Sequence, residues 1–119
     1  MVNKILIAIK SSPYGSGRAA EGLRVATAMI AMDMLPQILF VDDGVYCLLG
    51  NQKPEAEGLT SIGERVRTLV DLVGIHTVLD SMVKRKLKPE DLDPDYNVRF
   101  LSLGEGAKLI SENEASITF

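Results

Sequence analysis

The sequence predicts an α/β fold of three layers, in which helices cover both faces of a five-stranded, mainly parallel sheet. Two observations predict it. Short apolar runs alternate with longer segments of helical periodicity, which is typical of repeated strand–helix units. The first run, KILIAIK, is apolar throughout its centre, as in strands that are buried on both faces. The length of 119 residues suits a single domain that covers residues 1–119.

The first half of the chain supplies two strands and a helix between them. Residues 4–10 form the first strand. Residues 18–34 form a helix, because apolar residues recur there at spacings of three and four. Residues 37–43, QILFVDD, form a second buried strand, and Pro36 marks its entry. One helical turn over residues 45–51 follows.

The second half continues the alternation. The clearest amphipathic helix covers residues 62–74, where Gly74 marks the end of the helix. Its apolar stripe consists of Ile62, Val66, Leu69 and Val73. The remaining elements are a strand over 76–80, a short basic helix over 81–88, a strand over 98–102, a helix over 104–113 and a strand over 115–119.

Charge and cysteine content exclude several classes of function. The chain has 13 basic and 16 acidic residues and a net charge of -3, which argues against a nucleic-acid interface. The basic run Lys84-Arg85-Lys86 with Lys88 is expected to be a solvated helix end. The single cysteine, Cys47, excludes an internal disulfide and a four-cysteine zinc site, and a free thiol fits a reducing compartment. With neither a signal-peptide pattern nor an apolar run of about 20 residues, we expect a cytoplasmic protein without membrane contact.

The helix over 18–34 suggests assembly with other chains. After Arg24 it continues VATAMIAM, which is apolar on nearly every side. A helix that faced solvent would carry more charge, so its second face should contact a neighbouring subunit or another element of this chain. Of the two, we favour a subunit contact.

The loop after the first strand permits two interpretations. Gly15–Ala20 fits the pattern G-x-G-x-x-A of dinucleotide-binding turns, at the end of a strand where α/β sheets bind ligands. However, SSPY separates the strand from Gly15, which changes the geometry of such a turn. In the alternative, Pro13 and Gly15 form a turn and the Ser16 hydroxyl caps the helix.

Other candidate residues favour structural functions. Asp42 and Asp43 are adjacent, so on a strand they would point to opposite faces and could not act as a carboxylate pair. We expect them to form a turn and a cap rather than a metal site. His76, the only histidine, lies at a strand entry and is expected to be structural. No cofactor and no metal are expected.

Three stretches together resemble one known family. SSPYGSGRAAEGLRVATA, FVDDGVYCLLGNQKPE and ASITF are similar to the DsrE/DsrF-like sulfur-relay family, and within it to the TusC/DsrF branch. The resemblance implies a DsrEFH-like fold of the flavodoxin-like topology class. It assigns the family motif and the subunit interface to Tyr14, Gly15, Glu21, Gly22, Asp43, Gly44, Val45, Tyr46, Leu48, Leu49, Gln52, Lys53 and Pro54.

The resemblance also implies a function. Family members form trimers or hexamers with related subunits, exchange sulfur with small carrier proteins as a cysteine persulfide, and serve tRNA 2-thiouridine formation or sulfur oxidation. In heteromeric members the sulfur-bearing cysteine follows the third strand. The matching residues here, Val78-Leu79-Asp80-Ser81, contain no cysteine, which implies a non-catalytic partner subunit.

Cys47 is the remaining candidate for a sulfur carrier. Persulfide transfer requires an exposed thiolate. Backbone N–H groups of the predicted turn could lower the pKa of Cys47. Apolar neighbours surround it, and no Lys, Arg or His lies within five positions. Two alternatives therefore stay open, a packed and inert thiol or a persulfide carrier in a homo-oligomer. Small-ligand or nucleotide binding at Gly15–Ala20 is the third.

Overall fold

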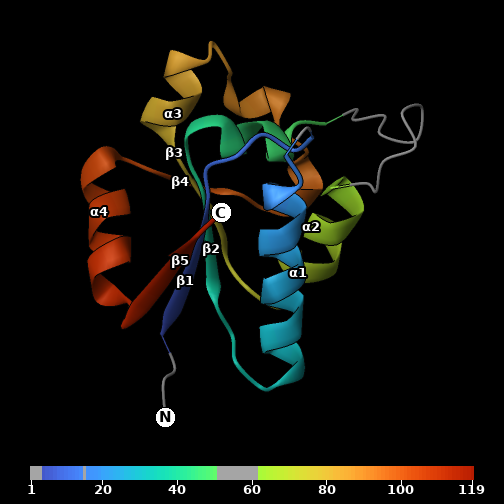
Figure 1. Ribbon diagram of the computed structural model, residues 1–119. Helices are drawn as coiled ribbons and strands as arrows, with labels where there is room; N and C mark the ends of the chain where they lie inside the picture. Colours follow the sequence, from blue (N-terminus) through green and yellow to red (C-terminus); the bar gives the residue numbers. More distant parts are fainter. Residues whose placement is uncertain (1–3, 15, 51–61) are drawn as a thin grey trace.

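The computed structural model describes residues 4–14, 16–50 and 62–119 and contains one five-stranded sheet with helices on both faces (Figure 1). The strand order is β4-β3-β2-β1-β5, and all four pairings are parallel. The strands are β1 (Ile5–Ile9), β2 (Gln37–Phe40), β3 (Ile75–Val78), β4 (Arg99–Leu101) and β5 (Ala115–Thr118). The predicted α/β fold is thereby confirmed.

Four α-helices and three short 3-10 helices connect the strands within the described residues. The α-helices are α1 (Arg18–Ala31), α2 (Ile62–Val70), α3 (Leu79–Lys84) and α4 (Leu103–Glu112). The 3-10 helices are η1 (Asp42–Leu48), η3 (Pro89–Asp91) and η4 (Pro94–Tyr96). No helix in this part of the chain is long and apolar enough to cross a membrane.

The strand order explains which face each helix covers. From β1 to β4 the chain adds strands in one direction, and right-handed crossovers then place α1 and α2 on the same face. The chain returns across the sheet to place β5 beside β1, so α4 lies on the opposite face (Figure 1). In a flavodoxin sheet, by contrast, the third strand lies beside the first. This chain therefore departs from the expected flavodoxin-like strand order.

Alternation along the strands divides the core in two. In β1, Ile7 and Ile9 belong to the larger cluster with α1 and α2, whereas Leu6 belongs to the smaller one under α4. The smaller cluster also contains Leu39, Val78 and Leu109. Both faces of the central strands are therefore covered, which accounts for the continuous apolar runs in the sequence.

Several boundaries differ from the sequence-based expectation because single residues adopt left-handed backbone conformations. The first helix ends near Ala31 because Asp33 has a φ of 61° and the N–H of Met34 bonds back to the carbonyl of Met29. The second strand ends at Phe40 rather than residue 43, since Asp42, with a φ of 51°, begins η1. The basic helix covers Leu79–Lys84 instead of 81–88.

The second apolar side of α1 contacts this chain itself. Val25, Met29 and Ile30 are half-buried and pack against the larger core cluster. The exposed part of the helix carries the small residues Ala28 and Ala31. The structure therefore accounts for these three apolar residues by an intramolecular contact, and the subunit contact at this helix stays a prediction.

Candidate functional site at the carboxyl end of the sheet

The loop after β1 forms a helix start that is anchored to α2. The N–H of Ile62 donates a hydrogen bond to the Tyr14 hydroxyl oxygen at 3.3 Å, and the Ser12 hydroxyl donates to the Tyr14 carbonyl at 3.1 Å. The Ser16 hydroxyl accepts from the N–H of Arg18 at 3.3 Å, but Gly17 rather than Ser16 is the N-cap residue. With a φ of 77°, Gly17 turns the chain into the helix in a conformation that favours glycine.

The motif residues of α1 stabilise the helix in different ways. Glu21 forms a surface ion pair with Arg24, whose hydrogen bond lowers the pKa of Glu21. Gly22 is buried, and a Cβ there would lie 3.0 Å from the Phe119 ring and 3.2 Å from the Ile9 side chain. Gly22 therefore allows the end of the chain to pack closely against α1.

Two hydrogen bonds connect η1 to α3, one through a backbone N–H of η1 and one through a carboxylate of η1. The N–H of Asp42 donates to the Ser81 hydroxyl oxygen at 3.1 Å. The Asp43 carboxylate accepts from Arg85 at 3.0 Å, and the same guanidinium donates to the Ser81 carbonyl at 3.1 Å. Asp42 and Asp43 thus lie in a helical turn rather than on a strand. No group of three or more His, Cys, Asp or Glu in the described ranges could hold a metal ion.

Cys47 lies inside the core. Its side chain is fully buried together with Val45 and Leu48, and its thiol lies 3.8 Å from the carbonyl oxygen of Ser11. Burial raises the pKa of Cys47 to about 12, because the apolar surroundings disfavour the thiolate. In this conformation the sulfur is neither ionised near neutral pH nor open to a reaction partner.

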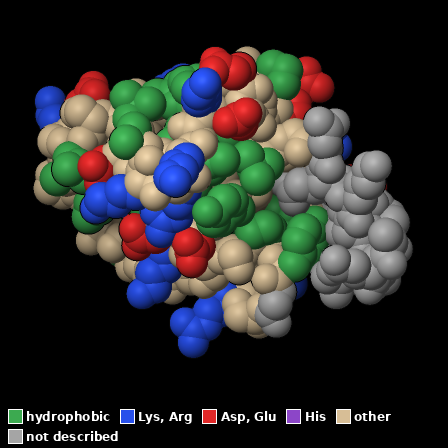
Figure 2. All heavy atoms as spheres, turned by 90° about the horizontal axis from the view of Figure 1, so that it is seen from above, with side chains coloured by type: hydrophobic (Ala, Val, Ile, Leu, Met, Phe, Trp, Pro, Cys, Tyr) green, Lys and Arg blue, Asp and Glu red, His purple; other side chains and the backbone are tan. Residues whose placement is uncertain are grey.

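The remaining motif residues lie nearer the surface. Tyr46 and Leu49 are half-buried, and Leu49 pairs with Leu92 in an isolated antiparallel bridge. Viewed from this end of the sheet, apolar side chains gather in the middle of the surface, and charged side chains of both signs lie beside them (Figure 2). The predicted interface residues Gly15, Gln52, Lys53 and Pro54 lie outside the described residues.

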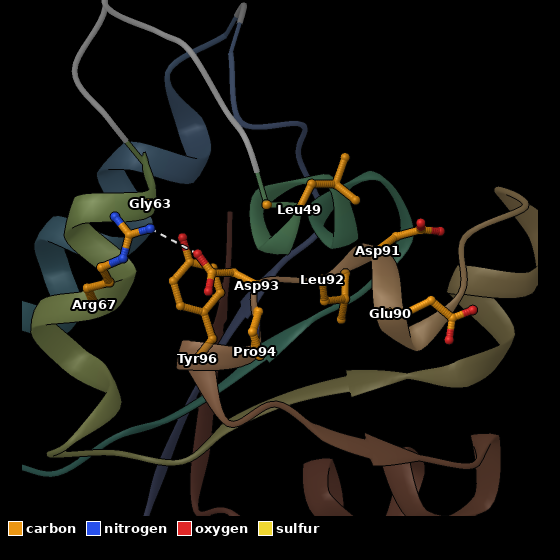
Figure 3. A pocket seen from close by; sticks show the side chains of 10 residues that line it. Leu49, Gly63, Arg67, Glu90, Asp91, Leu92, Asp93, Pro94 and Tyr96 are labelled. Carbon is orange, nitrogen blue, oxygen red and sulfur yellow. Dashed lines mark hydrogen bonds and ion pairs between the residues drawn. The ribbon is translucent and has the colours of Figure 1, made fainter.

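A pocket of about 450 Å³ opens beside Leu49 (Figure 3). On one side, Arg67 of α2 forms an ion pair with Asp93 at 2.9 Å, and its guanidinium lies over the Tyr96 ring at 5.7 Å from the centroid. Glu90 and Asp91 lie on the other side. Three carboxylates against one paired guanidinium make the pocket suitable for a neutral or cationic group rather than an anion.

No motif in the sequence points to Arg67, Asp93 and Tyr96 as functional residues. They lie on two elements that are separate in the sequence and meet only in the fold, within one wall of the pocket. The acidic run EDLDPD contained the only available signal, because the Asp-Pro step favours a turn. That signal does not reveal which cation the run would face.

His76 lies away from this end of the sheet. It is 4% exposed, and neither ring nitrogen has a hydrogen-bond partner among the described residues. Burial and the positive charge of Arg99 lower the pKa of His76. A neutral, buried imidazole agrees with the structural interpretation of this residue.

Two known proteins are similar to the chain over most of its length. The intracellular sulfur oxidation protein DsrF of Allochromatium vinosum is 29% identical over 133 aligned positions, which cover 100% of this chain and 98% of that protein. A protein TusC homolog of Aliivibrio fischeri is 33% identical over 94 positions, which cover 76% of this chain and 79% of that protein.

Solved structures share the fold. The ychN protein from E. coli superposes with a TM-score of 0.84 at 22% identity, covering 100% of both chains. MTH1491 of Methanobacterium thermoautotrophicum, a protein of unknown function, superposes with a TM-score of 0.70 at 14% identity, covering 98% of this chain and 99% of that one. The sequence model of the DsrE/DsrF-like family matches residues 3–119, and this chain therefore belongs to the DsrE/DsrF-like family.

Proposed function

We propose that this protein is a structural, non-catalytic subunit of a sulfur-relay assembly in which related DsrE-family subunits carry the persulfide. The printed names of two relatives, an intracellular sulfur oxidation protein DsrF and a TusC homolog, support a place in such a relay. The assembly is a trimer or hexamer, and its sulfur serves tRNA 2-thiouridine formation or sulfur oxidation.

The burial of Cys47 is the observation that carries this proposal. A persulfide carrier needs a thiolate that a second sulfur can reach. With a pKa of about 12, only roughly one thiol in 10⁵ is ionised at pH 7, and the side chain is fully buried. In this conformation Cys47 therefore cannot accept sulfur from a partner.

The residues after β3 support the same conclusion. Here the resemblance places the sulfur-bearing cysteine of a catalytic subunit, but this chain has Leu79, Asp80 and Ser81. Ser81 is buried and its hydroxyl accepts from Asp42, so it fixes η1. Asp80 forms an ion pair with Lys84 at 3.1 Å. These residues stabilise the carboxyl end of the sheet and provide no nucleophilic sulfur.

We assign contact with a sibling subunit to a motif surface that consists of Tyr14, Tyr46 and Leu49. All three are half-buried and lie where the family motif meets the end of the sheet. Partly exposed aromatic and aliphatic side chains are typical of interface cores. The anchoring of Tyr14 to Ile62 and of η1 to α3 keeps this surface rigid, which lowers the entropic cost of association.

Reconstitution with a sibling subunit tests the proposal. The partner is a DsrE-type chain with a cysteine after its third strand, and native mass spectrometry and persulfide labelling follow the complex. We expect co-assembly, sulfur on the partner's cysteine, and unchanged transfer when this chain carries Cys47→Ala.

Substitutions at the surface locate the contact. Leu49→Asp should weaken co-assembly, whereas Leu72→Asp should not, because Leu72 is exposed at the opposite end of the sheet. Thermal melting checks that both variants fold. Sulfur on Cys47, or equal co-assembly of the two folded variants, would contradict the proposal.

A further inference from the structure

An apolar groove lies beside strand β4, outside the motif surface. Its volume is about 410 Å³. Phe100 and Val98 line it from the side of β4, and Leu92 and Pro94 line it from the segment that contains η3 and η4. The aromatic side chain of Phe100 is 36% exposed, whereas that of Leu92 is buried. The groove thus offers apolar surface that this chain itself does not fill.

The strand beside the groove is the edge of the sheet. β4 pairs with β3 through Thr77 and Phe100, and no strand within the described residues pairs with its outer side. The outer N–H and C=O groups of an edge strand can pair with an added strand. Recognition by strand addition combines such backbone pairing with side-chain pockets next to the strand. In this structure the outer edge of β4 and the apolar groove lie next to each other.

The segment that forms the other wall is strongly acidic. Residues 89–96 contain Glu90, Asp91, Asp93 and Asp95 and no Lys or Arg. Asp93 forms an ion pair with Arg67, while the ion pairs of the described residues include none of the other three. Of these four acids, Glu90 and Asp93 line the groove, and no Lys or Arg of the described residues lines it, which favours a basic partner.

We infer that the β4 edge binds an extended peptide segment of a partner protein, with aliphatic residues at its centre and lysine or arginine at its ends. The aliphatic side chains enter the groove at Phe100, and the backbone pairs with β4. The basic ends lie near Glu90 and Asp93, the two carboxylates that line the groove. This interaction does not use Cys47, although Glu90, Leu92, Asp93 and Pro94 also line the pocket beside Leu49.

Fluorescence anisotropy with three labelled peptides tests the inference. The first has a valine centre and lysine ends, the second replaces lysine by glutamate, and the third replaces valine by serine. We expect the first to bind, and each replacement to weaken binding at least about 10-fold, because each removes one complementary feature. Added salt should weaken the first peptide's binding. Equal binding of all three, or no binding of the first at millimolar concentration, would overturn the inference.

Variants of this chain locate the peptide. Phe100→Ala and Glu90→Lys should each weaken binding about 5- to 10-fold. Leu103→Ala is the matched control, since Leu103 is an exposed apolar residue on α4 that does not line the groove. Amide exchange should show protection at Arg99–Leu101 when the peptide is bound. Binding that is unchanged in the Phe100 and Glu90 variants would refute the assignment to this edge.

Discussion

The carbonyl oxygen of Ile9 lies so close to the backbone of Gly44 that a Cβ atom at position 44 would stand 1.9 Å from it. The same carbonyl accepts a hydrogen bond from the N–H of Val41 at 3.0 Å, and the Val41 carbonyl accepts from Gly44 at 2.8 Å. Because it has no side chain, Gly44 allows η1 to lie in close contact with the end of β1. This contact positions Cys47 and the motif surface relative to the sheet.

Gly44→Ala should destabilise the protein by about 3 kcal/mol or more, because the new methyl group must displace backbone rather than a flexible side chain. Urea denaturation measures the loss. Gly104→Ala is the matched control, since a Cβ there would meet nothing closer than the Ser102 hydroxyl at 3.9 Å. It should leave stability unchanged or raise it by up to about 1 kcal/mol. Equal losses in the two variants would refute this account of Gly44.

Arg85→Ala should cost about 1 kcal/mol, because it removes both the contact with Asp43 and the hydrogen bond to the Ser81 carbonyl. The Arg85 side chain is only 20% exposed, which limits solvent screening. By contrast, Arg24→Ala should have no measurable effect, since its ion pair with Glu21 lies in solvent. Thermal and urea unfolding compare the two variants. A greater loss from Arg24→Ala would contradict the anchoring of η1 through Arg85.

The single histidine should make stability depend on pH. The pKa of His76 is lowered in the folded protein, so the unfolded chain binds the proton more tightly. The contribution of His76 to the free energy of unfolding is fully present above pH 6.5. It falls as the pH decreases toward the pKa of the folded state, by at most about 1.4 kcal/mol per pH unit. Proton NMR of the imidazole should give a pKa below 6.5. His76→Leu should remove the pH dependence just below 6.5, and a pKa above 6.5 would contradict the structure.

Alkylation of the native protein should report the burial of Cys47. With a pKa of about 12 and no exposed surface, the thiol should react with iodoacetamide orders of magnitude more slowly than a free cysteine at pH 8. Its rate should keep rising with pH beyond 9, where an ordinary thiol levels off. Unfolding in urea should restore ordinary reactivity. Rapid alkylation of the folded protein with a midpoint near pH 8 would show that the thiol is accessible.

The fold could be predicted from the sequence because local signals agreed with one another. Apolar runs such as that over residues 4–10 marked strands, and the stripe over residues 62–74 marked α2, so layers and parallel pairing followed. Boundaries were less predictable. Asp33 and Asp42 end elements through left-handed conformations that depend on tertiary contacts, and the hydrophobic pattern does not encode those.

The site was predictable only in part. The family motif follows the first two strands, so its place at the carboxyl end of the sheet could be predicted, while the apolar neighbours of Cys47 left its burial open. The contacts that define the site join distant positions, such as Asp43 with Arg85 and Arg67 with Asp93. Periodicity carries no information about which side chains meet across such separations. One sequence alone could therefore indicate where the motif lies, but not which tertiary contacts fix the conformation of its surface.

The most direct test of the account is the intact mass of the native protein after incubation with a persulfide donor. We predict no added sulfur on this chain, while a sibling subunit with a cysteine after its third strand gains about 32 Da in the same reaction. Denatured protein is the control and should accept sulfur at Cys47. A gain of about 32 Da by the native protein that Cys47→Ala abolishes would contradict the proposal that this subunit is non-catalytic.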